Sequence, residues 1–134
     1  MLFEDLVAWQ EARVLVKMIY IMTREKTIST DFRLVAQLRS AAVSIMSNVA
    51  EGFERHHLKE KIQFYNIARA SCGEVRSLMY VVTDSFPILD QDVNPCTEKL
   101  NSIGKLITGL IQSCQKRAKV GVPRPREGLG AGSP

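Results

Sequence analysis

One helical face between residues 61 and 80 combines basic and aromatic side chains. Counted at about 100° per residue, its members share one narrow sector: they are Lys61, Tyr65, Arg69, Arg76 and Tyr80. Arg and Lys can pair with phosphates and Tyr can stack on bases, so the pattern suits nucleic acid. The alternative is an amphipathic flank whose Arg stems cover apolar surface and whose tyrosines line a subunit contact.

Basic residues also gather at two other places in the chain. One is a thin stripe on the first helical segment, formed by Arg13, Lys17 and Arg24. The other is the C-terminal part, where the basic residues are Lys116, Arg117, Lys119, Arg124 and Arg126 and the acidic residue is Glu127. This part therefore carries the whole formal net charge of +4, and residues 1–115 are neutral. The basic composition alone is thus a weak argument for nucleic-acid binding.

Signatures of enzymes and of metal or cofactor sites are absent from the sequence. It contains no phosphate loop, no Gly-x-Gly-x-x-Gly element, no His-Glu-x-x-His helix and no Cys-x-x-Cys pair. The adjacent His56 and His57 diverge, which argues against a metal site. Glu51 and Glu74 could act as paired carboxylates, but we favour structural hydrogen bonding. We therefore expect a protein that is not an enzyme and has neither metal nor cofactor.

The cysteines and the N-terminus indicate a reducing compartment and hence a cytoplasmic location. Cys72, Cys96 and Cys114 are odd in number and far apart, which argues against a disulfide framework. Glu4 and Asp5 stand where a signal peptide would have basic residues. No apolar run approaches the roughly 20 residues of a membrane span.

All of these residues outside the C-terminal part are expected to lie on or next to helices. Four helical segments are expected, over about Phe3–Arg24, Asp31–Phe53, Leu58–Ser85 and Asn94–Ala118. Asn94 and Pro95 read as an N-cap and a first helical position, after a loop over 88–93. Long helices with short connections predict an all-α, up-down-up-down four-helix bundle over residues 1–118. Residues 119–134 are rich in Gly and Pro and are expected to form a disordered basic tail.

The first helix should have two apolar faces, although a helix of a bundle requires only one. Its core face consists of Trp9, Ala12, Val16 and Ile19. Its second face consists of Val7, Val14, Met18 and Ile21. Another subunit would bury the second face, so we expect a homo-oligomer. The alternative is one broad buried face in an irregular bundle.

The other helices each carry one apolar seam. In the second helix the seam consists of Leu34, Leu38, Ala41, Ala42, Ile45 and Val49. In the third helix it consists of Phe64, Ile67, Ala68, Ser71, Val75, Leu78 and Val82. In the fourth helix it consists of Leu100, Ile103, Ile107, Leu110 and Cys114. Opposite its seam, the second helix carries a polar stripe of Gln37, Ser40, Ser44, Ser47, Asn48 and Glu51. Such residues suit a close contact, so we expect a structural polar network of Gln37, Asn48, Glu51, Ser71 and Glu74. The alternative is a polar solvent face.

Several motifs resemble those of a known bacterial family. They are Phe3-x-Asp5-Leu6-x-x-Trp9-x-x-Ala12, Gln37-Leu38-Arg39, Asn48-x-Ala50-Glu51-Gly52 and Ser71-x-x-Glu74. Over about residues 3–90 the chain is similar to the four-helix-bundle family that includes proteins encoded in intervening sequences of large-subunit ribosomal RNA genes. The resemblance implies a left-handed bundle, a ring-like homopentamer and no enzymatic activity. A distant relative is the accessory protein of diversity-generating retroelements, which binds a reverse transcriptase and RNA.

Two functions are therefore expected candidates. The first is a non-enzymatic homo-oligomeric scaffold, pentameric by resemblance, that presents its basic surfaces to RNA or another nucleic acid. The second is a protein-partner adaptor, such as an accessory subunit of a reverse transcriptase or another nucleic-acid enzyme. Neither function involves a membrane.

Overall fold

Four long helices account for most of the chain. The structure, a computed structural model, describes residues 1–120, and the expected disordered tail from residue 121 onward lies outside the described residues. The long helices are α1 (Val7–Met22), α3 (Phe32–Glu54), α4 (Leu58–Ser85) and α5 (Asp90–Val120). Three short helical pieces join or precede them: η1 (Phe3–Asp5), α2 (Lys26–Ser29) and η2 (Pro87–Leu89). The expected all-α class is confirmed.

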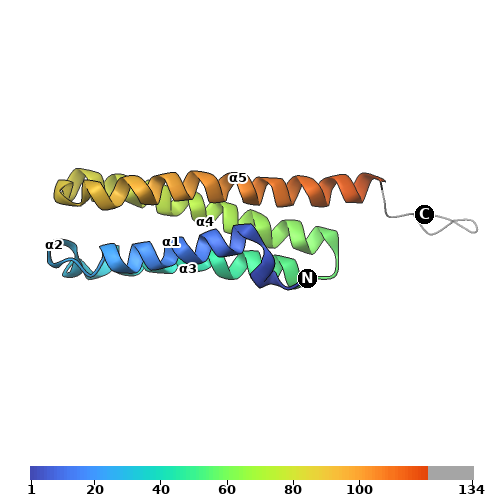
Figure 1. Ribbon diagram of the computed structural model, residues 1–134, viewed down its shortest axis with the longest axis horizontal. Coiled ribbons are helices and arrows are strands. Elements are labelled where there is room, and N and C mark those ends of the chain that lie inside the picture. The colour runs from blue at the N-terminus through green and yellow to red at the C-terminus, as the bar shows by residue number, and fades with distance from the viewer. Residues whose placement is uncertain (121–134) are drawn as a thin grey trace, which may run out of the picture.

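The long helices pack as a bundle in which neighbours in sequence are neighbours in space (Figure 1). The helix α3 contacts α1 and α4, and α5 contacts α4 and closes the bundle on α1. This arrangement follows from the short connections, which bring each helix back along the previous one. The last helix continues to Val120, two residues beyond the expected end of the bundle.

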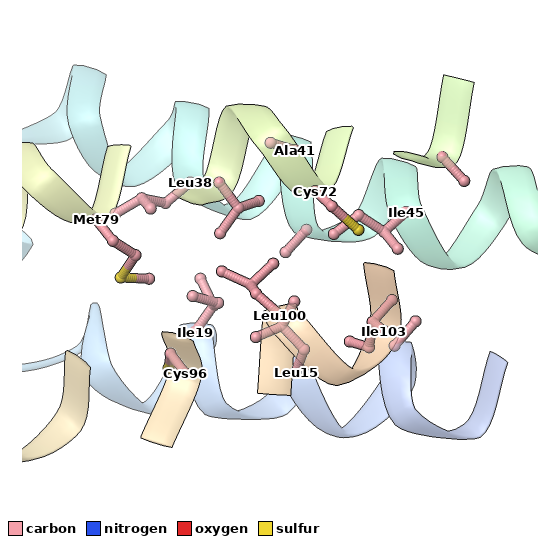
Figure 2. Packing of buried hydrophobic residues seen from close by; sticks show 14 of the residues in the cluster. Leu15, Ile19, Leu38, Ala41, Ile45, Cys72, Met79, Cys96, Leu100 and Ile103 are labelled. Carbon is pink, nitrogen blue, oxygen red and sulfur yellow. The ribbon is translucent and has the colours of Figure 1, made fainter. Parts of the chain in front are cut away.

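The core runs the length of the bundle and takes side chains from all four long helices. Figure 2 shows Ile19, Leu38, Met79 and Leu100 meeting there. The expected seam of α3 is confirmed, since its six residues are all buried. In α5 the seam is confirmed except that Ile111 takes the core position expected for Leu110, which is half-buried.

The seam of α4 differs from the expected one. The expected residues Ala68, Ser71, Val75 and Val82 are buried, but so are Tyr65, Cys72 and Met79, and Ile67 is exposed. The core stripe is therefore rotated toward α5 relative to the stripe read from the sequence. In α1 the buried residues are Ala8, Ala12, Leu15, Ile19 and Met22, while Trp9 and Val16 are half-buried.

The beginning of α5 was wrongly assigned from its sequence. Pro87 starts η2 and the long helix begins at Asp90, so Pro95 lies inside α5 rather than at its first position. Proline has no N–H, and the carbonyl of Gln91 therefore lacks its usual helical partner. Gln91 is exposed, so water can satisfy that carbonyl. Burial of Leu89 and Val93 fixes this segment against the bundle.

Candidate nucleic-acid interface

A groove runs along the outside of the bundle between α4 and α5. It consists of two adjacent hollows of about 570 Å³ and about 530 Å³, which share Arg76 and Asn101 in their linings. The first hollow is lined by Arg69, Cys72, Gly73, Arg76, Leu100, Asn101, Gly104, Lys105 and Thr108. The second is lined by Arg76, Met79, Tyr80, Thr83, Val93, Asn94, Thr97 and Asn101.

The charge of the groove comes from three cations. Arg69, Arg76 and Lys105 line it, and among the described residues no Asp or Glu does. The ion pairs formed within residues 1–120 lie elsewhere, between Arg55 and Glu51 and between Lys99 and Glu11. The three groove cations are therefore available to an anionic ligand.

Arg69 is held over the groove by both flanking helices. Its Nη1 donates to Oγ1 of Thr108 on α5 at 3.4 Å, and its Nη2 donates to Oδ1 of Asn66 at 3.0 Å. These neutral acceptors orient the guanidinium without neutralising it. Its remaining N–H groups can still donate to a phosphate.

The first hollow exists because two glycines face it. A Cβ atom placed on Gly73 or on Gly104 would meet no atom within 4 Å, so ordinary side chains would fill this space. Burial raises the pKa of the Cys72 thiol in the hollow to about 11, which keeps that thiol neutral and adds no negative charge. The hollow is thus positively charged and open to a ligand.

Sequence reasoning found only part of this groove. Arg69, Arg76 and Tyr80 were expected to share a face and do, but Asn101, Lys105 and the two glycines were missed. The feature of the sequence that could have indicated the groove is the pair Gly73 and Gly104 in the interior of long helices. A glycine at such a position destabilises the helix by about 1 kcal/mol relative to alanine. A helix interior that retains glycine often does so because something must approach closely.

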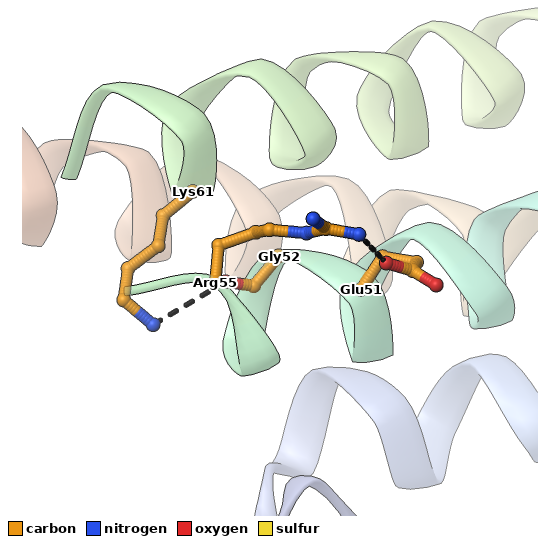
Figure 3. Close-up of polar contacts among 4 residues, drawn as sticks. All are labelled: Glu51, Gly52, Arg55 and Lys61. Carbon is orange, nitrogen blue, oxygen red and sulfur yellow. Dashed lines mark hydrogen bonds and ion pairs between the residues drawn. The ribbon is translucent and has the colours of Figure 1, made fainter. Parts of the chain in front are cut away.

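Lys61 and Tyr65, the other two members of the expected basic and aromatic face, have structural roles. Tyr65 is buried rather than exposed, and burial raises its pKa to about 12. Lys61 donates from Nζ to the carbonyl oxygen of Phe53 at 2.7 Å. It also donates to that of Gly52 at 3.3 Å, a contact drawn in Figure 3. A cation at the end of α3 satisfies carbonyls that have no helical partner.

Comparison with known proteins identifies the family. The model of the 23S rRNA-intervening sequence protein family matches residues 4–109. The chain belongs to this family. All the residues that line the α4–α5 groove lie within the matched region.

The fold is shared with a solved member of the S23 ribosomal protein family. That structure is a crystal structure of a protein of unknown function from Bacteroides thetaiotaomicron. It superposes with a TM-score of 0.68 at 18% sequence identity, over 79% of this chain and 99% of the other. At this identity the likeness shows the fold alone. No curated protein matches the chain.

Gly52, at the end of the motif that resembles the family, permits Tyr65 to enter the core. A Cβ atom on Gly52 would lie 2.6 Å from Cε1 of Tyr65. Beside it, Glu51 pairs with Arg55 on the surface, and this hydrogen bond raises the pKa of Arg55 (Figure 3). The motif therefore shapes the end of α3 so that α4 can pack against it.

Replacing Gly52 by alanine should destabilise the protein by about 1–3 kcal/mol, because Tyr65 is enclosed and would have to move. Urea unfolding at fixed protein concentration measures the change. Gly109→Ala is the matched control, since a Cβ there meets nothing within 4 Å and should stabilise by up to about 1 kcal/mol. Equal stability of Gly52→Ala and the wild type would contradict this role of Gly52.

Arg39, in the Gln-Leu-Arg motif, joins α3 to the end of α1. Its Nε donates to Oγ1 of the buried Thr23 at 2.9 Å, and its guanidinium lies 4.4 Å from the centre of the Tyr20 ring. The same Thr23 hydroxyl donates to the carbonyl of Ile19 at 2.7 Å. This contact fixes the register of the two helices.

Substitution of Arg39 by methionine keeps an apolar stem but removes the hydrogen bond and the contact with Tyr20. We expect a loss of about 1–3 kcal/mol in the free energy of unfolding. Arg33→Met, at an exposed position of the same helix, should change it by no more than about 0.5 kcal/mol. Thermal or urea unfolding of both variants measures these changes. Equal losses of unfolding free energy in the two variants would show that the contacts of Arg39 with Thr23 and Tyr20 do not stabilise the bundle.

The expected polar network forms only in its central part. Oγ of Ser44 and Oγ of Ser71 are 2.8 Å apart, and Nδ2 of Asn48 donates to the carbonyl of Ser44 at 2.8 Å and to its Oγ at 3.0 Å. These contacts join α3 to α4. Gln37 and Glu74 are exposed, and Glu51 instead pairs with Arg55.

Glu51 and Glu74, the disfavoured candidates for a carboxylate pair, do not lie close together within one chain. The helices α3 and α4 are antiparallel, with Ser44 opposite Ser71. Glu51 lies seven residues beyond Ser44, and Glu74 lies three residues beyond Ser71 in the opposite direction. At ~1.5 Å per residue they are roughly 15 Å apart along the bundle, too far to share a proton.

The other predicted basic residues lie outside the groove. Arg13 and Lys17 line a separate hollow of about 380 Å³ on α1, where the guanidinium of Arg13 lies 5.8 Å from the centre of the Trp9 ring. Arg24 is exposed beyond the end of α1, and the basic residues at the end of α5 are also exposed: Lys116, Arg117 and Lys119. The Arg13 stripe does not extend the groove, which α1 does not line.

The second apolar face of α1 is largely uncovered in a single chain. Val7 is 55% exposed, Val14 42% and Ile21 48%, while Met18 is half-buried. The three exposed residues are spaced by seven and form a straight stripe along the helix. No helix within residues 1–120 is both long and apolar enough to cross a membrane.

Proposed function

We propose that this protein is a non-enzymatic, homo-oligomeric helical-bundle scaffold that binds RNA or another nucleic acid through the α4–α5 groove. The observation that supports this function is the lining of the groove. Three cations border it, no carboxylate does so among the described residues, and none of the three is paired with an acid. Phosphates are the ligands that such a row of cations attracts.

Self-association supports this function by repeating the groove. One groove with three cations binds a polyanion weakly, but several grooves on one assembly raise the avidity. The exposed stripe of Val7, Val14 and Ile21 is the surface that we assign to the subunit contact. It leaves the groove open because α1 contributes none of the lining residues. A ring of five subunits, implied by the family resemblance, is part of this proposal.

A second candidate function is that of a protein-partner adaptor, such as an accessory subunit of a reverse transcriptase. It is favoured by apolar residues that the groove does not use, on the outer faces of α3 and α4. They are Val43, Ile67 and Val81, each about two-fifths exposed. A protein partner could bury them, whereas nucleic acid gains little from them.

The test of the proposed function is binding of a fluorescently labelled single-stranded RNA by micromolar protein at low salt. We expect a complex whose affinity falls steeply as salt is raised, since bound phosphates release counterions. Absence of a complex at low salt would contradict nucleic-acid binding and favour the adaptor function.

A further inference from the structure

The two halves of the groove differ in chemistry. The half around Arg69 and Lys105 is cationic. The half around Tyr80 contains uncharged polar side chains, those of Thr83, Asn94 and Thr97, and its single cation is Arg76 at the junction. A ligand that fills both halves must therefore have an anionic part and a neutral polar part.

Two acidic residues, although they do not line the groove, lie one helical turn beyond residues of the Tyr80 half and disfavour phosphate there. Asp90 lies one helical turn before Asn94 on α5, and Asp84 lies one turn after Tyr80 on α4. Residues four apart share a helix face. A phosphate at this end would approach these carboxylates, whereas an uncharged group would not be repelled.

Tyr80 offers an unused aromatic surface at this end. It lines the hollow and is 69% exposed, so its ring face is accessible to a ligand. The amides of Asn94 and Asn101 face the same hollow and can both donate and accept hydrogen bonds. A flat ring with amide groups nearby is a combination that binds a nucleobase by its face and its edge.

We propose that the groove binds a single strand, with phosphates on Arg69, Arg76 and Lys105 and a base stacked on Tyr80. This inference rests on the proposed function and names its ligand class. Stacking needs a free base face, which a duplex does not offer because its bases are already stacked. Arg69 and Arg76 are about 10.5 Å apart along α4, a span that a flexible strand can follow.

The test compares three ligands and two variants by fluorescence anisotropy at one low salt concentration. The ligands are a labelled 12-nucleotide oligouridine, the same backbone without bases, and a 12-base-pair RNA duplex. The variants are Tyr80→Ala and Tyr80→Trp. Because Tyr80 is exposed, neither change should disturb the fold, and circular dichroism checks this.

We expect Tyr80→Ala to weaken oligouridine binding roughly 5- to 150-fold while leaving the abasic strand unaffected. Tyr80→Trp should retain the affinity, and oligouridine, unlike the abasic strand, should quench its fluorescence. Unchanged oligouridine affinity in Tyr80→Ala, or equal wild-type affinity for all three ligands, would overturn the stacking site but leave nucleic-acid binding intact. Failure of the wild type to bind any of them would overturn the proposed function as well.

Discussion

The double substitution Val14→Glu with Met18→Glu is expected to give a folded, helical protein whose assembly has a lower mass than that of the wild type. Val14 is 42% exposed and Met18 is half-buried at the side of the same face. Each large apolar side chain buried in a subunit contact contributes about 1.5–3 kcal/mol, and a charge placed there is costly to bury. Light scattering measures the mass and circular dichroism measures the helix content.

Two further variants keep this experiment decisive. Val7→Glu with Val14→Glu changes only exposed positions, so it should dissociate the assembly with no effect on the core. Ile88→Glu is the control, since Ile88 is 73% exposed on η2, which contacts α4 and α5, and should leave the mass unchanged. If Val14→Glu with Met18→Glu unfolds the protein and the exposed pair leaves the mass unchanged, the α1 face is not the subunit contact. The stripe from Gln37 to Glu51 would then be the next surface to change.

An odd-numbered ring also constrains the partner of the α1 stripe. Such a ring cannot be built from two-fold contacts alone, so the stripe must meet a different surface of the next subunit. The outer faces of α3 and α4, with exposed Val43, Ile67 and Val81, are the apolar surface that a second copy could cover.

Replacing the three groove cations by glutamine should abolish most of the nucleic-acid affinity. For single strands, the logarithm of the binding constant falls with the logarithm of the salt concentration, with a slope of about −0.7 for each phosphate neutralised. The triple variant with Arg69→Gln, Arg76→Gln and Lys105→Gln should therefore have a slope that is smaller in magnitude by about two per groove. At about 50 mM salt this corresponds to a several-hundred-fold loss of affinity. Anisotropy titrations over a series of salt concentrations measure both quantities.

A matched variant separates the groove from net charge. Arg13→Gln, Lys17→Gln and Arg24→Gln remove the same number of charges from α1 and the turn after it, outside the groove. We expect this variant to keep most of the affinity and slope. Equal losses in the two triple variants would show that overall charge, and not the groove, binds the strand.

Periodicity predicted the core of α3 and most of that of α5, but it placed the stripe of α4 too far to one side. In α3, Ser44 and Asn48 mark one edge of the stripe, and the apolar residues beyond the other edge, Val35 and Met46, are partly buried as well. In α4, apolar residues lie on both sides of the stripe, with Ile67 on one and Met79 on the other. Which side is buried depends on α5 and on Gly52, which makes room for Tyr65. A single helix does not contain that information.

The groove was only half-predicted for a similar reason. The pattern within α4 placed Arg69, Arg76 and Tyr80 on one side, but a groove has two walls, and the second wall belongs to α5. Which face of α5 meets α4 is set by packing of the whole bundle. The sequence pattern therefore did not assign Lys105, on that face, to the site.

Sedimentation of the protein with a labelled single-stranded RNA tests whether the assembled protein binds the strand in its α4–α5 groove. The protein and the RNA are detected at separate wavelengths. The variant is Gly104→Leu, which should fill the groove without changing its charge, because a side chain there has open space. Gly109→Leu, outside the groove, is the control. We predict one assembly mass for all three proteins, with RNA co-sedimenting with the wild type and Gly109→Leu but not with Gly104→Leu. RNA that co-sediments equally with all three proteins, or with none of them, would contradict the account.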